Sequence, residues 1–172
     1  MNTTLPSKLS ATAKKWVKLI HVTAAALWGG GSTSVAVVVC FFHPRTAAEL
    51  YAFFMCLYYI DMIVIGIGAA GCMFTGLFYS WKTTWGFTKH RWIVAKWLLL
   101  SMYGLFGLFW FLPWLASSIS FVSTLPPAQP IGEESASLAL VHRTLVAVHA
   151  SFVLLFMYLS VKKPSLKFGA KK

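Results

Sequence analysis

Acidic side chains are scarce in this chain, since Asp and Glu together supply only 4 of its 172 residues. All charged residues amount to 11%, against about 25% in ordinary soluble domains. Four carboxylates cannot give a globular surface solvated charge of both signs, so the composition excludes a soluble enzyme. A hydrophobic content of 58% equally excludes a disordered tail. The net charge of +11 then needs an explanation from where the basic residues lie.

Cysteine is also rare, with three residues at positions 40, 56 and 72 and no C-x-x-C spacing. An odd number of cysteines within apolar segments does not make a secreted disulfide scaffold, and we interpret them as small apolar packing residues. No period of 20 to 50 residues indicates internal repeats.

What the chain does contain is long apolar segments, and a membrane span needs about 20 such residues. We predict four spans, at 16–42, 51–81, 92–117 and 138–161. Each must be helical, because a lone span in lipid has no other way to satisfy its backbone polar groups. The sequence therefore predicts an all-α polytopic membrane protein, with 1–172 as one antiparallel four-helix domain. The proline-containing connection 117–137 is expected to be extended and partly irregular.

The basic residues gather on one side of this predicted bundle. Lysines and arginines precede the first span, separate the second from the third and follow the fourth, whereas the other side holds Arg45, Glu133 and Glu134. The positive-inside rule places both termini in the cytoplasm, in a multi-pass protein of the inner (cytoplasmic) membrane with an uncleaved first helix. Topology and attraction to anionic lipid account for the +11 charge, so nucleic acid is not an expected partner.

Several ionisable side chains lie within or at the edge of the predicted spans. A charge at the centre of a span costs about 2.5–3.5 kcal/mol on insertion scales, so such residues mark functional sites. In this sequence they are His21, Asp61, Lys96, His142, Arg143 and His149.

Depth and helical periodicity sort these residues. His21 and Lys96 each lie about one turn inside the cytoplasmic face and share a level. His142 and His149 lie in the outer half, on one face of the fourth span and roughly 10 Å apart along its axis. Arg143 is expected to reach the outer interface. Asp61 should pair with His142, His149 or Arg143, either to orient an imidazole or to relay protons.

Two helix faces could hold a flat ligand. On the first span His21 shares a stripe with Ala25, Trp28, Ser32 and Val35, next to the run Gly29–Gly31, and the second span has small residues at Gly68, Cys72 and Gly76. Such bare backbone permits close helix packing or leaves room for a planar ligand. The fourth span places its two histidines among Leu145, Val146, Phe152 and Phe156.

The donor set favours haem over zinc. Zinc requires three or four ligands around one point, whereas haem requires one or two axial ligands and an apolar slot. We therefore predict one or two haem b groups, with His21, His149 and His142 as candidate iron ligands and Trp28 and Arg143 as further cofactor contacts. Lys96 and Asp61 are the candidate catalytic residues. Lys96 would act as a ligand, a base or the partner of a haem propionate.

Three segments carry a resemblance to a known family. The run KLIHVTAAALWGGG, the end of the second span MFTGLFYSW and the start of the third span HRWIVAKWLLL are similar to HemJ-type protoporphyrinogen IX oxidases. That resemblance implies a four-helix haem b protein in which His21 binds iron and Lys96 is required for function. The fourth span lacks the polar stretch of HemJ proteins, and TTWGFTKHRWIVAK and YLSVKKPSLKFG resemble more closely a sister family of small membrane proteins.

Three functions are consistent with the sequence. The first is a haem b membrane protein that transfers electrons between a quinone or another small oxidant and a redox partner. The second is a HemJ-like oxidase, and the third is a non-enzymatic membrane subunit or small transporter without a cofactor. In each case we expect the chain to lie in the lipid bilayer, and all three functions are compatible with a homo-oligomer.

Overall fold

The computed structural model describes residues 9–83 and 86–163, and the described part is helical. Its elements in chain order are α1 Ala11–Phe41, α2 Ala47–Tyr59, η1 Ile60–Ile65, α3 Gly66–Lys82, α4 Arg91–Phe106, η2 Gly107–Phe111, α5 Leu112–Ser123 and α6 Glu133–Lys162. The two η elements are π-helical segments that continue the flanking α-helices without a break.

Four continuous helices are long and apolar enough to cross a membrane: Ala11–Phe41, Ala47–Lys82, Arg91–Ser123 and Glu133–Lys162. The prediction of four spans is confirmed, and the chain is a multi-pass membrane protein. The third helix extends further than expected, to Ser123 rather than position 117. Ser117 and Ser118 fit inside it because their hydroxyls donate to the Trp114 carbonyl (2.8 and 2.9 Å), so polar residues here do not end the helix.

Local signals set the helix starts. The Ser10 hydroxyl accepts a hydrogen bond from the Ala13 amide (3.1 Å) and caps α1. At α2 the Thr46 hydroxyl accepts from the Glu49 amide (3.3 Å), and the Glu49 carboxylate accepts from the Arg45 amide (2.7 Å). This reciprocal pattern is a variant of the capping box.

Each of the two central candidate spans, Ala47–Lys82 and Arg91–Ser123, contains a π-helical turn. In η1 the Gly66 amide donates to the Asp61 carbonyl, and in η2 the Leu112 amide donates to the Gly107 carbonyl, each five residues back. Pro113, which cannot donate a backbone hydrogen bond, lies in the first turn of α5, two positions after the end of η2. Such π turns widen the helix locally and often occur at functional sites.

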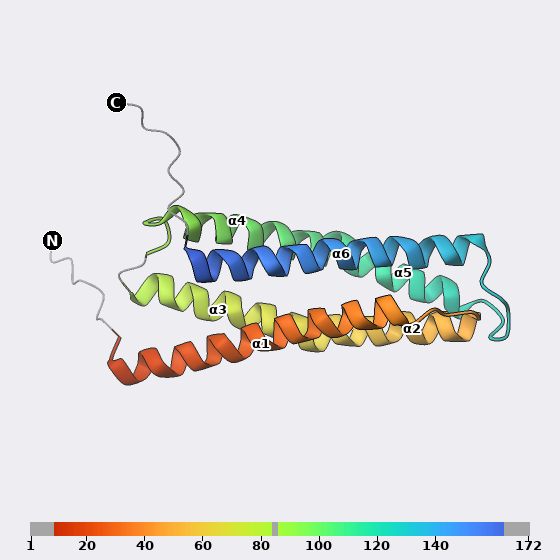
Figure 1. The fold of residues 1–172 in the computed structure, drawn as a ribbon, viewed down its shortest axis with the longest axis horizontal. Coiled ribbons are helices and arrows are strands. Elements are labelled where there is room, and N and C mark those ends of the chain that lie inside the picture. Colours follow the sequence, from red (N-terminus) through yellow and green to blue (C-terminus); the bar gives the residue numbers. More distant parts are fainter. Residues whose placement is uncertain (1–8, 84–85, 164–172) are drawn as a thin grey trace, which may run out of the picture.

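The helices form an elongated bundle (Figure 1). The start of α1, the α3–α4 connection and the end of α6 lie at one end of it, and the α1–α2 and α5–α6 connections lie at the other. At this second end the two connections bond to each other: the Ala47 amide donates to the Gln129 carbonyl (2.9 Å), and the Ile131 amide donates to the Arg45 carbonyl (3.1 Å). Prolines 126, 127 and 130 lie in the connection between α5 and α6, as expected.

Close packing of α1 on α3 depends on glycine. A Cβ added at Gly68 would lie 2.5 Å from the Trp28 nitrogen and 2.8 Å from the Ala24 carbonyl oxygen, and one at Gly31 would lie 2.8 Å from Ile65 Cγ1. The small-residue runs therefore serve helix contact at these positions. Gly29 and Gly30 have no neighbour within 4 Å of such an atom.

The best-packed core lies between α2 and α5. Leu50, Phe54, Leu57 and Leu115 are fully buried there. By contrast, Ile93 is the one buried residue of the 16 in α4. The bundle is thus tightly packed toward the end of the two connections and more open around α4.

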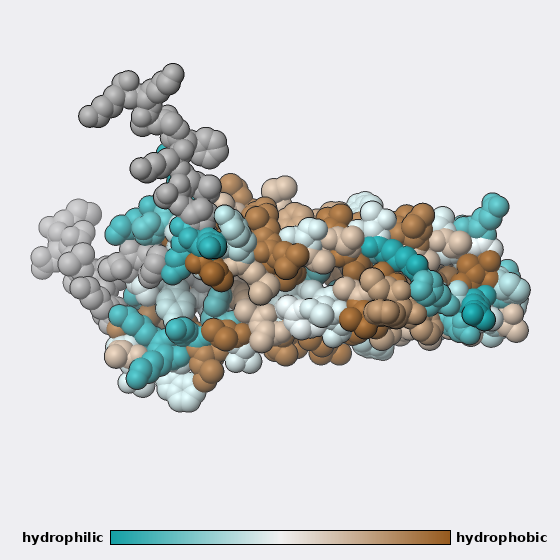
Figure 2. Space-filling model, viewed as in Figure 1, coloured by the Kyte–Doolittle hydropathy of each residue, from teal (hydrophilic) through white to brown (hydrophobic). Residues whose placement is uncertain are grey.

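Apolar side chains cover the middle of the molecule, and hydrophilic residues gather near its two ends (Figure 2). Leu98, Phe109 and Leu154, for example, are each at least 62% exposed. Large exposed apolar area of this kind is unfavourable in water and is consistent with contact with lipid.

We predict that Gly68→Ala lowers the free energy of unfolding by about 1–3 kcal/mol, because its new methyl group meets backbone atoms of α1 that cannot rotate away. Gly30→Ala is the matched control, since its methyl group enters open space and should leave stability unchanged or slightly higher. Thermal unfolding of both variants in neutral detergent measures the difference. Equal melting temperatures would contradict the close approach of α1 and α3.

Candidate functional site

His21 is held in one orientation by α3. Its Nδ1 lies 2.7 Å from Thr75 Oγ1, and the Thr75 hydroxyl donates to the Gly71 carbonyl (2.6 Å). Because the threonine hydroxyl has a backbone acceptor, the arrangement favours Nδ1–H of His21 as the donor to Thr75 Oγ1. The lone pair of a neutral His21 then lies on Nε2, which makes no hydrogen bond with any described residue.

Such a histidine fits the coordination of a haem iron. Metal-binding histidines donate their other ring N–H to a fixed acceptor, and this contact sets both the tautomer and the ring orientation. Thr75 is that acceptor here. Cys72 lies beside it, with its thiol 3.9 Å from the His21 carbonyl oxygen. Around His21, the described residues offer one imidazole nitrogen, His21 Nε2, as a possible iron ligand.

Lys96 of α4 lies near the same level. Its ammonium group interacts electrostatically with His21 and Cys72, and Nζ donates to the Ser160 hydroxyl of α6 (2.9 Å). Lys96 is half-buried. The structure therefore brings His21 and Lys96 together across the bundle, where four of its helices contribute polar atoms.

His149 belongs to a separate hydrogen-bonded chain deeper in the membrane. The Ser32 hydroxyl donates to the Trp28 carbonyl (2.8 Å), so Ser32 Oγ accepts from His149 Nε2–H (2.7 Å). His149 Nδ1 then accepts from the Tyr103 hydroxyl (2.7 Å). This chain connects α1, α4 and α6 and engages both ring nitrogens of His149. Trp28 lies against it, with its ring 5.7 Å from that of Tyr103.

Asp61 lies in η1 and is half-buried. Its carboxylate interacts electrostatically with Tyr103, and no described residue donates a hydrogen bond to it. The expected pairing with His142, His149 or Arg143 is wrong: His149 bonds to Ser32 and Tyr103, and Arg143 bonds to the Phe42 carbonyl (3.3 Å).

His142 is enclosed by aromatic rings. It has no exposed surface, and its ring centre lies 5.7–6.1 Å from the centres of Phe53, Phe54, Phe111 and Trp114. Neither ring nitrogen has a hydrogen-bond partner. No described residue lines up with it as a second metal ligand, and no group of three or more His, Cys, Asp or Glu side chains gathers anywhere in the described part of the chain.

The sequence-predicted residues thus fall into separate layers rather than one site. His21 and Lys96 form the first layer, here called the inner layer, near the end that holds the start of α1. His149, Asp61 and Tyr103 belong to a middle layer. His142 and Arg143 lie toward the α1–α2 and α5–α6 connections at the other end. Sequence reasoning missed Thr75, Tyr103 and Ser160. Tyr103 could have been found because it lies seven positions after Lys96, on the same face of α4.

Comparisons of the chain with protein-family models, with curated proteins and with solved structures give no match.

We predict that Tyr103→Phe lowers the free energy of unfolding by about 0.6–1.7 kcal/mol, the range for interhelical hydrogen bonds in membranes, because His149 Nδ1 loses its donor. Tyr158→Phe is the matched control, since the Tyr158 side chain is 54% exposed and its hydroxyl contacts no described residue. Thermal unfolding in detergent compares the two. A Tyr158→Phe variant as unstable as Tyr103→Phe would contradict the hydrogen-bonded chain.

Proposed function

We propose that the chain is an integral membrane haem b protein with a role in electron transfer, and that His21 is the axial ligand. The observation that carries this proposal is the anchored imidazole of His21, whose Nδ1 is fixed on Thr75 while Nε2 remains free. Among the histidines of the spans, His21 alone combines a fixed tautomer with an uncommitted nitrogen. When bound, haem iron supplies one-electron chemistry at this position.

The surrounding residues suit an apolar ring with charged edges. Thr75 orients the imidazole, and a hydrogen bond of this kind also raises the basicity of the ligand. Lys96 interacts electrostatically with His21 and would be available to a propionate or as a second ligand, and its hydrogen bond to Ser160 holds it in position. The sparse covering of α4 leaves that helix accessible to a ligand or to a redox partner such as a quinone.

The remaining predicted residues support this site from a distance. His149 and Tyr103 fix α6 against α4, and through Ser32 against α1, so they hold the helices that flank His21 and Lys96. In this proposal His149 and His142 are structural. Asp61 interacts electrostatically with Tyr103, and an ionisable side chain within a span would be a candidate proton carrier for such a site.

A HemJ-like oxidase would use the same two residues, His21 and Lys96, and rests on the resemblance of the first three spans. A cofactor-free subunit is the competing function, and one observation favours it. The hydrogen-bonded chain Ser32–His149–Tyr103 is typical of polar side chains whose only role is to hold membrane helices together. Haem binding distinguishes the cofactor-free function from the other two.

We also propose that the four spans are antiparallel and that both termini face the cytoplasm. Supporting this orientation, the end that holds Lys14, Lys15 and Lys18 also holds Lys82 and Lys162, whereas the other end holds Arg45, Glu133 and Glu134. The positive-inside rule assigns the lysine-rich end to the cytoplasm.

Expression of the full chain with an ample haem supply should give a coloured protein with a Soret band. His21→Ala should lose most of this band because iron loses its ligand, and Thr75→Val should weaken haem affinity about 10- to 100-fold. His43→Ala, an exposed histidine at the opposite end, is the control and should keep the band. A colourless wild-type protein, or an unchanged band in His21→Ala, would overturn the proposal.

For the orientation, alkaline phosphatase fused after Lys163 should be inactive and a fluorescent protein fused there should be fluorescent. Alkaline phosphatase inserted at Gln129, within the connection between α5 and α6, should be active because that connection faces the other side. The reverse pattern of activities would show that the termini face outward.

A further inference from the structure

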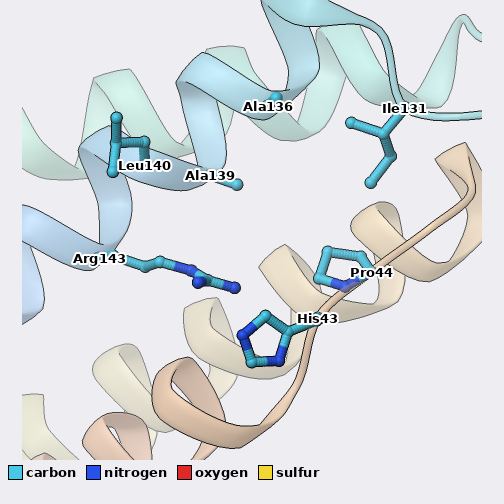
Figure 3. Close-up of a pocket in the computed structure, with 7 residues that line it drawn as sticks. All are labelled: His43, Pro44, Ile131, Ala136, Ala139, Leu140 and Arg143. Carbon is cyan, nitrogen blue, oxygen red and sulfur yellow. The ribbon is translucent and has the colours of Figure 1, made fainter.

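A small cavity lies beside the connection between α1 and α2, and residues of this connection and of α6 line it (Figure 3). Its volume is about 210 Å³. Pro44, Ile131, Ala136, Ala139 and Leu140 give it apolar walls, and Arg143 and His43 supply its polar groups. Arg143 extends from α6, and His43 extends from the connection toward the same space.

The guanidinium group of Arg143 has few partners for its five donors. One Nη donates to the Phe42 carbonyl at 3.3 Å, and Nε is buried without a hydrogen-bond partner. No carboxylate of the described residues forms an ion pair with Arg143. Glu49, in the first turn of α2, instead accepts from the Arg45 amide. A half-buried cation with an orphaned donor is costly unless an anion completes it.

His43 adds a second polar group to the cavity. Its Nδ1 lies 3.2 Å from the Phe41 carbonyl oxygen, which can only accept, so Nδ1 carries the proton. The Nε2 atom of a neutral His43 is then an acceptor for a hydroxyl group. The Arg143 guanidinium can donate to phosphate oxygens, and the His43 Nε2 atom can accept from a hydroxyl group of the same ligand. The two side chains together suit a phosphate ester whose substituent carries a hydroxyl group.

We propose that this cavity binds the phosphate headgroup of an anionic lipid, with Arg143 on the phosphate. Its volume lies below the roughly 300–1,000 Å³ of pockets that enclose a whole small molecule, so it would hold a headgroup while the chains remain in the bilayer. The apolar walls and the position at the end of the spans favour a lipid over a free anion. The site is separate from His21 and does not depend on haem.

Lipid titration of the full chain in neutral detergent, followed by native mass spectrometry, tests this site. The probes are phosphatidylglycerol, phosphatidylcholine and inorganic phosphate. We expect phosphatidylglycerol to bind most tightly and Arg143→Gln to weaken it at least about tenfold, as for the loss of a charge-assisted hydrogen bond. Arg45→Gln is the matched control: it removes the same charge from an exposed position on the connection between α1 and α2, and affinity should stay within about twofold.

A second variant keeps the test sharp if Arg143→Gln does not fold. Ala139→Leu fills the wall of the cavity without changing its charge and should also weaken phosphatidylglycerol binding. Equal losses in Arg143→Gln and Arg45→Gln would overturn the site in favour of general surface charge. Inorganic phosphate that binds as tightly as phosphatidylglycerol and competes with it would overturn the lipid assignment.

Discussion

The absence of water inside the bilayer is the constraint on which this structure depends. Backbone polar groups must be satisfied within each span, which makes every span a helix, and side-chain polar groups must find partners on neighbouring helices. The Ser32–His149–Tyr103 chain shows this in one line of hydrogen bonds that connects three helices. The His21–Thr75 contact does the same between α1 and α3. These polar contacts fix which helix faces meet.

Glycine then decides how closely the helices approach. With no hydrophobic effect to drive apolar helices together in lipid, contact depends on van der Waals packing of small residues. Gly31 and Gly68 bring α1 onto the η1–α3 segment so closely that a methyl group would not fit. On the opposite side, α4 has one buried residue and keeps polar Lys96 half-buried. The bundle therefore combines a rigid pair of helices with a loosely covered one, an arrangement suited to a site between them.

Each of the three polar layers would have a different role in the proposed function. The inner layer offers one imidazole nitrogen beside a cation, the middle layer holds the helices in register, and the outer end places a poorly partnered arginine beside an apolar cavity. His142 is fully buried among four aromatic rings without a hydrogen bond, and the structure gives it no chemical role.

The sequence by itself determined the number of helices, their approximate bounds and the short list of ionisable residues within them, because apolar length and charge are properties of the chain alone. It also predicted that Trp28, Ser32 and Val35 share a stripe with Ala25 on the first span; the first three are buried, whereas Ala24 is buried in place of Ala25. It could not decide which side chains bond to the nitrogens of each histidine, or that Asp61 has no hydrogen-bond partner among the described residues. Those facts depend on the rotation and separation of helices distant in sequence, and only tertiary packing fixes them.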